Sequence, residues 1–151
     1  MNRKHSFTGR LPAKIMSVLL VTTLLLSMMI VGTTAFAAET KTEGDYTYTV
    51  LSDGTAQITK YSGAEAQVTV PAQLGGADVS SIGTKAFENN DEIESVTFSE
   101  GIKTIGDYAF SGCDLLETVN IPSSVTLIDK YAFEKCRALQ SVDIPSTVKT
   151  V

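Results

Sequence analysis

The chain has 151 residues, about the length of one domain. It carries 12 Lys and Arg against 17 Asp and Glu, a net charge of −5. This acidic balance argues against nucleic acid and anionic membrane surfaces as partners.

Residues 1–37 have the three parts of a secretory signal peptide. The positive start holds four basic residues, Arg3, Lys4, Arg10 and Lys14. The apolar middle is IMSVLLVTTLLLSMMIV, residues 15–31, and small residues at Ala35 and Ala37 predict cleavage after Ala37. The alternative is an uncleaved membrane anchor, but the apolar stretch is near the lower length limit for spanning a bilayer and ends at a cleavage site. After cleavage, eight basic and 17 acidic residues remain, a net charge of −9.

Residues 38–67 are predicted to form a lead-in and a β-hairpin. The segment AETKTEG, residues 38–44, is typical of a flexible lead-in. Residues 45–63, DYTYTVLSDGTAQITKYSG, hold two alternating runs around an Asp-Gly pair, which is a strong hairpin signal. Because the first coil of a repeat protein must be covered, this hairpin is interpreted as an amino-terminal cap.

From residue 68 the chain repeats itself. IGDYAFSGCDLLETVNIP begins at Ile105 and IDKYAFEKCRALQSVDIP begins at Ile128, so nine of 18 positions recur at an offset of 23 residues. The units are residues 68–95, 96–118, 119–141 and a partial unit, 142–151. The first unit has five extra residues around Gly75 and Gly76, which are interpreted as a loop insertion. A fixed period of this length predicts a solenoid.

The recurring positions are apolar columns, such as Phe87, Phe110 and Phe133. One unit cannot bury these side chains alone, but stacked units can. ETVNIP and QSVDIP alternate and end in proline, so each predicts a short strand. IKTI and VTLI predict a second, shorter strand, and YAFSGCDLL and YAFEKCRAL predict helical or 3₁₀ turns. The predicted fold is mostly β with short helical turns.

These residues resemble the BspA-like (Treponema-type) leucine-rich repeat family, whose unit has the form C-x-x-L-x-x-V-x-I-P-x-x-V-x-x-I-G-x-x-A-F. One unit matches it with Cys113, Leu116, Val119, Ile121, Pro122, Val125, Ile128, Ala132 and Phe133. Three residues depart from this pattern: Ser99 replaces the Pro, Asn90 replaces the Cys and Asp129 replaces the Gly. The resemblance implies a leucine-rich-repeat solenoid in a secreted or surface-anchored bacterial protein that adheres to host proteins or other cells.

Cys113 and Cys136 occupy one column of the repeat. Secretion permits a disulfide, and stacked coils would place the two Cα atoms about 5 Å apart. Two buried thiols acting as small apolar residues are favoured instead, because Asn90 fills the same column in the preceding unit.

Catalytic and metal-binding patterns find no support in the sequence. The acidic run is interpreted as a solvated edge, because no calcium-loop pattern surrounds its members Asp91, Glu92, Glu94, Asp114 and Glu117. A zinc site would need His or more Cys, and the one histidine, His5, lies in the signal peptide. No nucleophile elbow, Cys/His pair or phosphate-cradling loop is present. We therefore expect no enzymatic activity, no cofactor and no metal.

The exposed side of the strand stack is the candidate partner-binding face. Polar residues flank the inward valines in each unit: Ser95, Thr97, Thr118, Asn120, Ser141 and Asp143. The resemblance implies that ligands bind on this face. A merely solvated sheet face is the alternative for any single residue.

The leading functional hypothesis is a secreted or cell-surface binding protein. Its partner would be a protein or glycan ligand on host or neighbouring cells, without nucleic acid and without membrane insertion after signal cleavage. The alternatives are a structural spacer that presents a domain beyond Val151, and the non-catalytic part of a secreted enzyme. Val151 aligns with Ile105 and Ile128, so we expect a carboxyl end truncated mid-repeat and a fragment that is poorly soluble alone.

Overall fold

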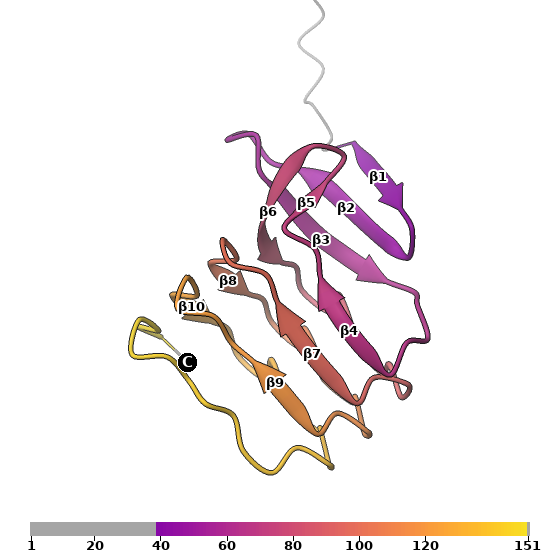
Figure 1. Ribbon diagram of the computed structural model, residues 1–151, viewed down its shortest axis with the longest axis vertical. Helices are drawn as coiled ribbons and strands as arrows, with labels where there is room; N and C mark the ends of the chain where they lie inside the picture. The colour runs from indigo at the N-terminus through magenta and orange to yellow at the C-terminus, as the bar shows by residue number, and fades with distance from the viewer. Residues whose placement is uncertain (1–38, 151) are drawn as a thin grey trace, which may run out of the picture. The chain divides into compact units, whose positions relative to one another are not determined.

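The structure is a computed structural model that describes residues 39–150, which belong to one compact unit. The signal peptide predicted over residues 1–37 lies outside the described residues. The described part contains ten strands (Figure 1): β1 (Thr40–Glu43), β2 (Tyr46–Val50), β3 (Ala56–Tyr61), β4 (Gln67–Val70), β5 (Gln73–Leu74), β6 (Ala77–Ile82), β7 (Ser95–Phe98), β8 (Thr104–Ile105), β9 (Thr118–Asn120) and β10 (Leu127–Ile128).

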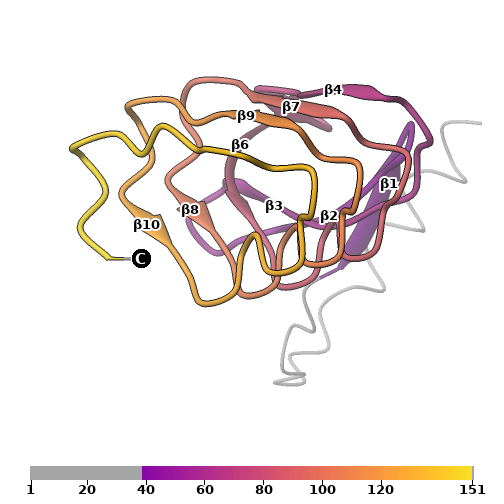
Figure 2. The same ribbon diagram turned by 90° about the horizontal axis from the view of Figure 1, so that it is seen from below.

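Strands of successive repeats form two parallel ladders. β4 pairs with β7 and β7 with β9, while β6 pairs with β8 and β8 with β10. Figure 2 shows the coils one behind another, with β4, β7 and β9 along one side. Each coil contributes one strand to each ladder, so the predicted solenoid, mostly β, is confirmed.

The first ladder follows the repeat register of the sequence. Val68 lies beside Val96 and Val96 beside Val119, and all three are buried. Their chain neighbours point the other way, because successive side chains of a strand alternate between its two faces. Pro71 follows β4 directly, where the chain leaves the ladder and no N–H is needed for it.

The segments predicted as short helical turns are not helical, and residues 39–150 contain no helix. The N–H of Ala109 donates to the Gly106 carbonyl within its own coil, but the next N–H, that of Phe110, donates to Ala132 of the following coil. In a helix, each N–H beyond the first turn donates to a carbonyl of the same segment, four residues earlier. A helix also requires negative φ, whereas Tyr108 has a φ of 53°. The alternating donors therefore build a third ladder between coils, and pairing between repeats overrides the local helical pattern.

An aromatic column runs through the core of the coils. Tyr61 stacks on Phe87 at 5.0 Å between ring centroids, Phe87 on Phe110 at 4.6 Å and Phe110 on Phe133 at 5.6 Å. Tyr46 lies against the outer side of Tyr61 at 5.0 Å and 45°. The predicted column of three phenylalanines is confirmed, and the two tyrosines extend it into the hairpin that precedes the repeats.

The predicted hairpin is formed by β2 and β3, which pair antiparallel. β3 also pairs in parallel with β6, so the hairpin continues the second ladder. The flexible lead-in predicted over residues 38–44 is wrong in part, because β1 pairs with β2 along its whole length. The side chains of β1 are all exposed, so it is the free backbone edge of β2 that orders this segment.

The insertion in the first repeat is a hairpin rather than an open loop. β5 and β6 pair antiparallel, with Leu74 opposite Ala77. Gly75 and Gly76 make the two-residue connection with φ values of 57° and 79°. Two consecutive positive φ values are the requirement of a type I′ turn, which glycine meets without strain.

The strand predicted in QSVDIP, residues 140–145, is absent. The last described coil is held instead near β10, where Leu127 and Thr150 form a parallel bridge and Lys149 N–H donates to the Thr126 carbonyl at 2.9 Å. Val142, which was expected to fill the valine column, is only half-buried.

Candidate interaction surface

The outward side chains of β4, β7 and β9 form one continuous polar surface. In cross-strand register, Gln67, Ser95 and Thr118 make one row, and Thr69, Thr97 and Asn120 make a second row. These six residues are called the polar strip. Ser95 is half-buried and the other five are exposed. Neighbouring parallel strands lie about 4.8 Å apart, so each row spans roughly 10 Å between its outer strands.

Four of the six residues predicted for the partner-binding face lie on this surface. Ser95, Thr97, Thr118 and Asn120 lie together on the exposed face of the ladder. Ser141 and Asp143 are exposed but lie outside any strand, because the fourth strand is absent. Whether any of the six binds a partner stays a prediction.

Ser141 and Asp143 were expected beyond β9, but the two rows extend at the opposite end of the ladder, to Gln67 and Thr69 of β4. Sequence reasoning missed them, although their segment QVTV matches SVTF of β7 position by position. The signal was present in the alignment of Val68 with Val96, which places Gln67 and Thr69 on the same face as Ser95 and Thr97.

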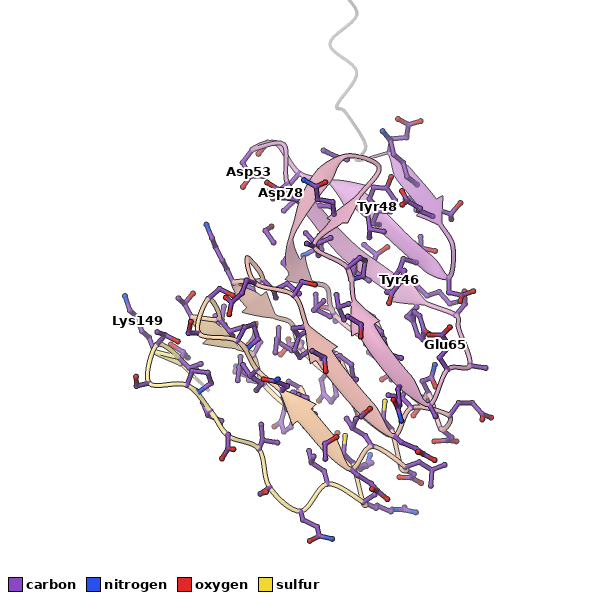
Figure 3. The ribbon with its side chains drawn as sticks, in the orientation of Figure 1. Tyr46, Tyr48, Asp53, Glu65, Asp78 and Lys149 are labelled. Carbon is purple, nitrogen blue, oxygen red and sulfur yellow. The ribbon has the colours of Figure 1, made fainter. Side chains whose placement is uncertain are left out.

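A pocket borders the polar strip at β4. Its volume is about 350 Å³, and its walls come from β1–β3, the chain after β3 and the segment around β5. The hydroxyl of Tyr46 donates to the Thr69 carbonyl at 3.2 Å and ties the hairpin to the strip. In Figure 3, Tyr46 and Glu65 lie on the same side of the molecule, next to β4.

The two tyrosines of this pocket titrate above their ordinary range. Burial raises the pKa of Tyr46, and the neighbouring Tyr61, Glu65 and Asp45 raise it further. Burial also raises the pKa of Tyr61, with Glu65 and Asp45 as further causes. Both phenols therefore stay neutral at physiological pH and act as hydrogen-bonding aromatic walls.

Cys113 and Cys136 are free thiols, as favoured by the sequence, and both are buried. Cys113 Sγ donates to the Phe87 carbonyl at 3.1 Å, and Cys136 Sγ donates to the Phe110 carbonyl at 3.1 Å. Burial raises the pKa of Cys113 to about 12 and also raises that of Cys136. These thiols are packing residues with a hydrogen-bonding role between coils, not nucleophiles.

The acidic run lies on exposed or half-buried positions along one edge of the coils. Its one ion pair joins Asp114 to Arg137 of the next coil at 3.3 Å between Nη1 and Oδ2. Within residues 39–150, no group of three or more His, Cys, Asp or Glu side chains is arranged to hold a metal ion.

Comparison with known proteins identifies related repeats. The family model described as a BspA type leucine rich repeat region matches residues 66–151 in six copies. No curated protein matches the chain. Across the described part of the chain, no helix has the length and apolar character needed to cross a membrane.

Three solved structures from bacteria are similar. A leucine-rich repeat protein from Bacteroides capillosus is 32% identical, with a TM-score of 0.70 over 74% of this chain and 87% of that one. The leucine rich repeat protein of T. pallidum is 28% identical, with a TM-score of 0.68 over 73% of this chain. A leucine rich cell surface protein from Faecalibacterium prausnitzii is 31% identical, with a TM-score of 0.56 over 76% of this chain. The matched region covers 52% of the T. pallidum chain and 39% of the F. prausnitzii chain.

Proposed function

Because this chain belongs to the BspA-type leucine-rich repeat family, we propose that it is a secreted or cell-surface protein-binding module whose polar strip contacts the partner. The observation that carries this proposal is the register of six polar side chains on the exposed face of a three-stranded parallel ladder. Their neighbours point inward and pack in the core, so the strip is held rigid without using its own side chains.

The proposed location rests on two observations. Residues 1–37 have the charge pattern, apolar stretch and small residues of a secretory signal peptide. The similar F. prausnitzii protein is described as a cell surface protein. A module that adheres to host proteins, glycans or neighbouring cells would act outside the cell. We propose a role in binding rather than catalysis, because the relatives are repeat proteins and the strip holds no acid–base pair.

The size of the strip limits the affinity that it can supply alone. A stable protein interface buries about 800 Å² on each partner. Three strands at about 4.8 Å spacing offer a strip that is only about 15 Å wide including its edges. We therefore expect micromolar or weaker binding by one copy, with avidity from many copies or from a longer array.

The test compares cell attachment by two triple variants. Beads that carry the chain are applied to epithelial monolayers and to bacterial cells. The strip variant changes Thr97, Thr118 and Asn120 to Lys, and the control variant adds the same charge at three exposed positions off the strip, Thr84, Ser123 and Gln140.

The strip variant should lose attachment while its circular dichroism stays native, and the control variant should keep attachment. If both variants attach as the unmodified chain does, the strip is not the binding surface. The structural-spacer interpretation would then be favoured.

A further inference from the structure

The pocket beside β4 combines an aromatic wall with an unbalanced negative charge. Its lining includes Tyr46 and Tyr61, the carboxylates of Glu43, Asp45 and Glu65, and no lysine or arginine. We propose that this pocket receives the cationic head of a lysine or arginine side chain from the bound partner protein. The proposal deepens the proposed function and rests on it, because it names the chemistry that the partner must present beside the polar strip.

The aromatic wall is rigid and suited to a cation. Tyr46 and Tyr61 lie 5.0 Å apart between centroids with 45° between their planes. Tyr61 is held from behind by the Phe87 ring at 5.0 Å. The Tyr46 hydroxyl is fixed on the Thr69 carbonyl. An ammonium or guanidinium group over the half-buried ring of Tyr46 is attracted by its quadrupole, and arginine can also stack on it.

The carboxylates determine the sign of the charge that the ligand must carry. Glu43 Oε2 accepts the Gly75 N–H at 2.7 Å, so this carboxylate is already fixed. Asp45 and Glu65 take part in none of the ion pairs found among residues 39–150. Their charge also contributes to the raised pKa values of Tyr46 and Tyr61, so the field of these groups reaches the rings. A cation in the pocket would meet negative charge that no basic side chain of the lining offsets.

An organic cation fits better than a metal ion. The described residues contain no cluster of His, Cys, Asp and Glu with metal-binding geometry. The pocket volume of about 350 Å³ also exceeds what a bare ion fills and admits a guanidinium with part of its alkyl stem.

The pocket is placed to anchor a segment that lies on the strip. Thr69 belongs to both, since its side chain lies in the second row of the strip and the residue lines the pocket. A partner chain that crosses β9, β7 and β4 would therefore reach the pocket at the end of its path. A single charged anchor beside a polar strip gives such a contact direction and register.

The first experiment is an NMR titration of the full chain with the peptide acetyl-Gly-Ser-Arg-Ser-Gly-amide. Its matched control has citrulline, which is uncharged and nearly isosteric, in place of arginine. We expect the arginine peptide to shift the resonances of Tyr46, Tyr61 and Gly75 with millimolar affinity, and the citrulline peptide to shift them much less. Equal shifts with both peptides would overturn the proposal.

The second experiment compares two double variants that each remove two negative charges. The change Asp45→Asn with Glu65→Gln should weaken binding of the arginine peptide about fivefold, as expected for exposed charges worth up to about 1 kcal/mol. The change Glu100→Gln with Glu117→Gln removes exposed carboxylates outside the pocket and should have little effect. Equal weakening would mean that net charge alone attracts the peptide, which contradicts a pocket.

The cell-attachment assay separates this proposal from the one on which it rests. Loss of attachment in both the strip variant and the pocket variant supports both. Loss in the strip variant alone would show that the partner does not use the pocket. If neither variant changes attachment while the arginine peptide still binds, the proposed function fails although the pocket accepts cations.

Discussion

The ring of Phe110 lies 4.6 Å from that of Phe87, with only 15° between the two planes. Phe110 is completely buried, and it also forms a T-shaped contact with Phe98 at 5.7 Å and stacks on Phe133 at 5.6 Å. Equivalent side chains of successive repeats therefore pack directly on each other. Because the sequence repeats every 23 residues, this contact recurs from coil to coil and makes the core continuous.

Replacing Phe110 by Ala should destabilise the fold strongly. It removes a buried ring between two occupied neighbours, and such cavities cost about 3 to 5 kcal/mol. Phe133 is only half-buried, so Phe133→Ala is the matched variant and should cost less. Free energies of unfolding from urea titrations measure both. Equal losses would show that the last coil is packed as tightly as the middle one.

The repeat register was predictable because its signal is repeated and apolar. Val96 and Val119, like Phe87 and Phe110, recur at one offset, and each copy packs on its equivalent in the next coil. The helical turns were predicted wrongly for a physical reason. YAFSGCDLL has a local pattern typical of a turn of helix, but the N–H of Phe110 gains a better-placed acceptor in the next coil.

The candidate site was predictable only in part. The outward residues of β7 and β9 follow from the alternation around their valines, so Thr97 and Asn120 were found. The pocket is a different case, because its walls join Tyr46 and Tyr61 of the hairpin to Thr69 of the first repeat. No spacing rule relates these residues, and only the docking of β3 beside β6 brings them together.

Substitutions at the two glycines of the β5–β6 turn should differ in cost. Any residue other than glycine is strained at their positive φ by about 1 to 2 kcal/mol. A side chain at Gly76 meets open space, so Gly76→Ala should cost only that strain. A Cβ at Gly75 meets the hydroxyl of Tyr48, which is buried and has little room to move, so Gly75→Ala should cost more. Chemical denaturation measures the difference, and a larger loss at Gly76 would contradict this geometry.

Asn90 should be partly replaceable by cysteine. Its Nδ2 donates to the Gly63 carbonyl at 2.9 Å, much as Cys113 Sγ donates to the preceding coil at Phe87. Asn90→Ala leaves that carbonyl without its partner and should cost about 1 kcal/mol. Asn90→Cys restores a weak hydrogen-bond donor at a repeat position that holds cysteine in the next two coils. The unfolding free energy of this variant should therefore lie between those of Asn90→Ala and the unmodified chain.

Urea titrations measure the unfolding free energies of the unmodified chain, Asn90→Ala and Asn90→Cys at one pH below 8, where the thiols are protonated. The Asn90 side chain also accepts the Glu92 N–H at 3.1 Å, which cysteine reproduces poorly, so full recovery is not expected. A cysteine variant no more stable than the alanine variant would mean that the thiol donors contribute nothing between coils.

The two buried thiols should make the fold less stable in alkaline solution. Burial raises the pKa of Cys113 from 9.0 to about 12, and that of Cys136 is raised too. Above pH 9 the unfolded chain loses these protons while the folded chain keeps them, so the unfolded state binds fewer protons and stability falls as pH rises. Below pH 9 both states hold the protons, and the thiols add no pH dependence. We therefore expect the unfolding free energy to decline between pH 9 and pH 12, and to decline less steeply in a Cys113→Ala, Cys136→Ala variant.

Urea titrations at pH 8 and pH 10.5 compare how steeply the unfolding free energy of the two proteins falls with pH. Comparing slopes removes the constant cost of the substitutions themselves. Identical slopes would show that both thiols ionise as readily in the folded chain as in the unfolded one, and hence that they are not buried.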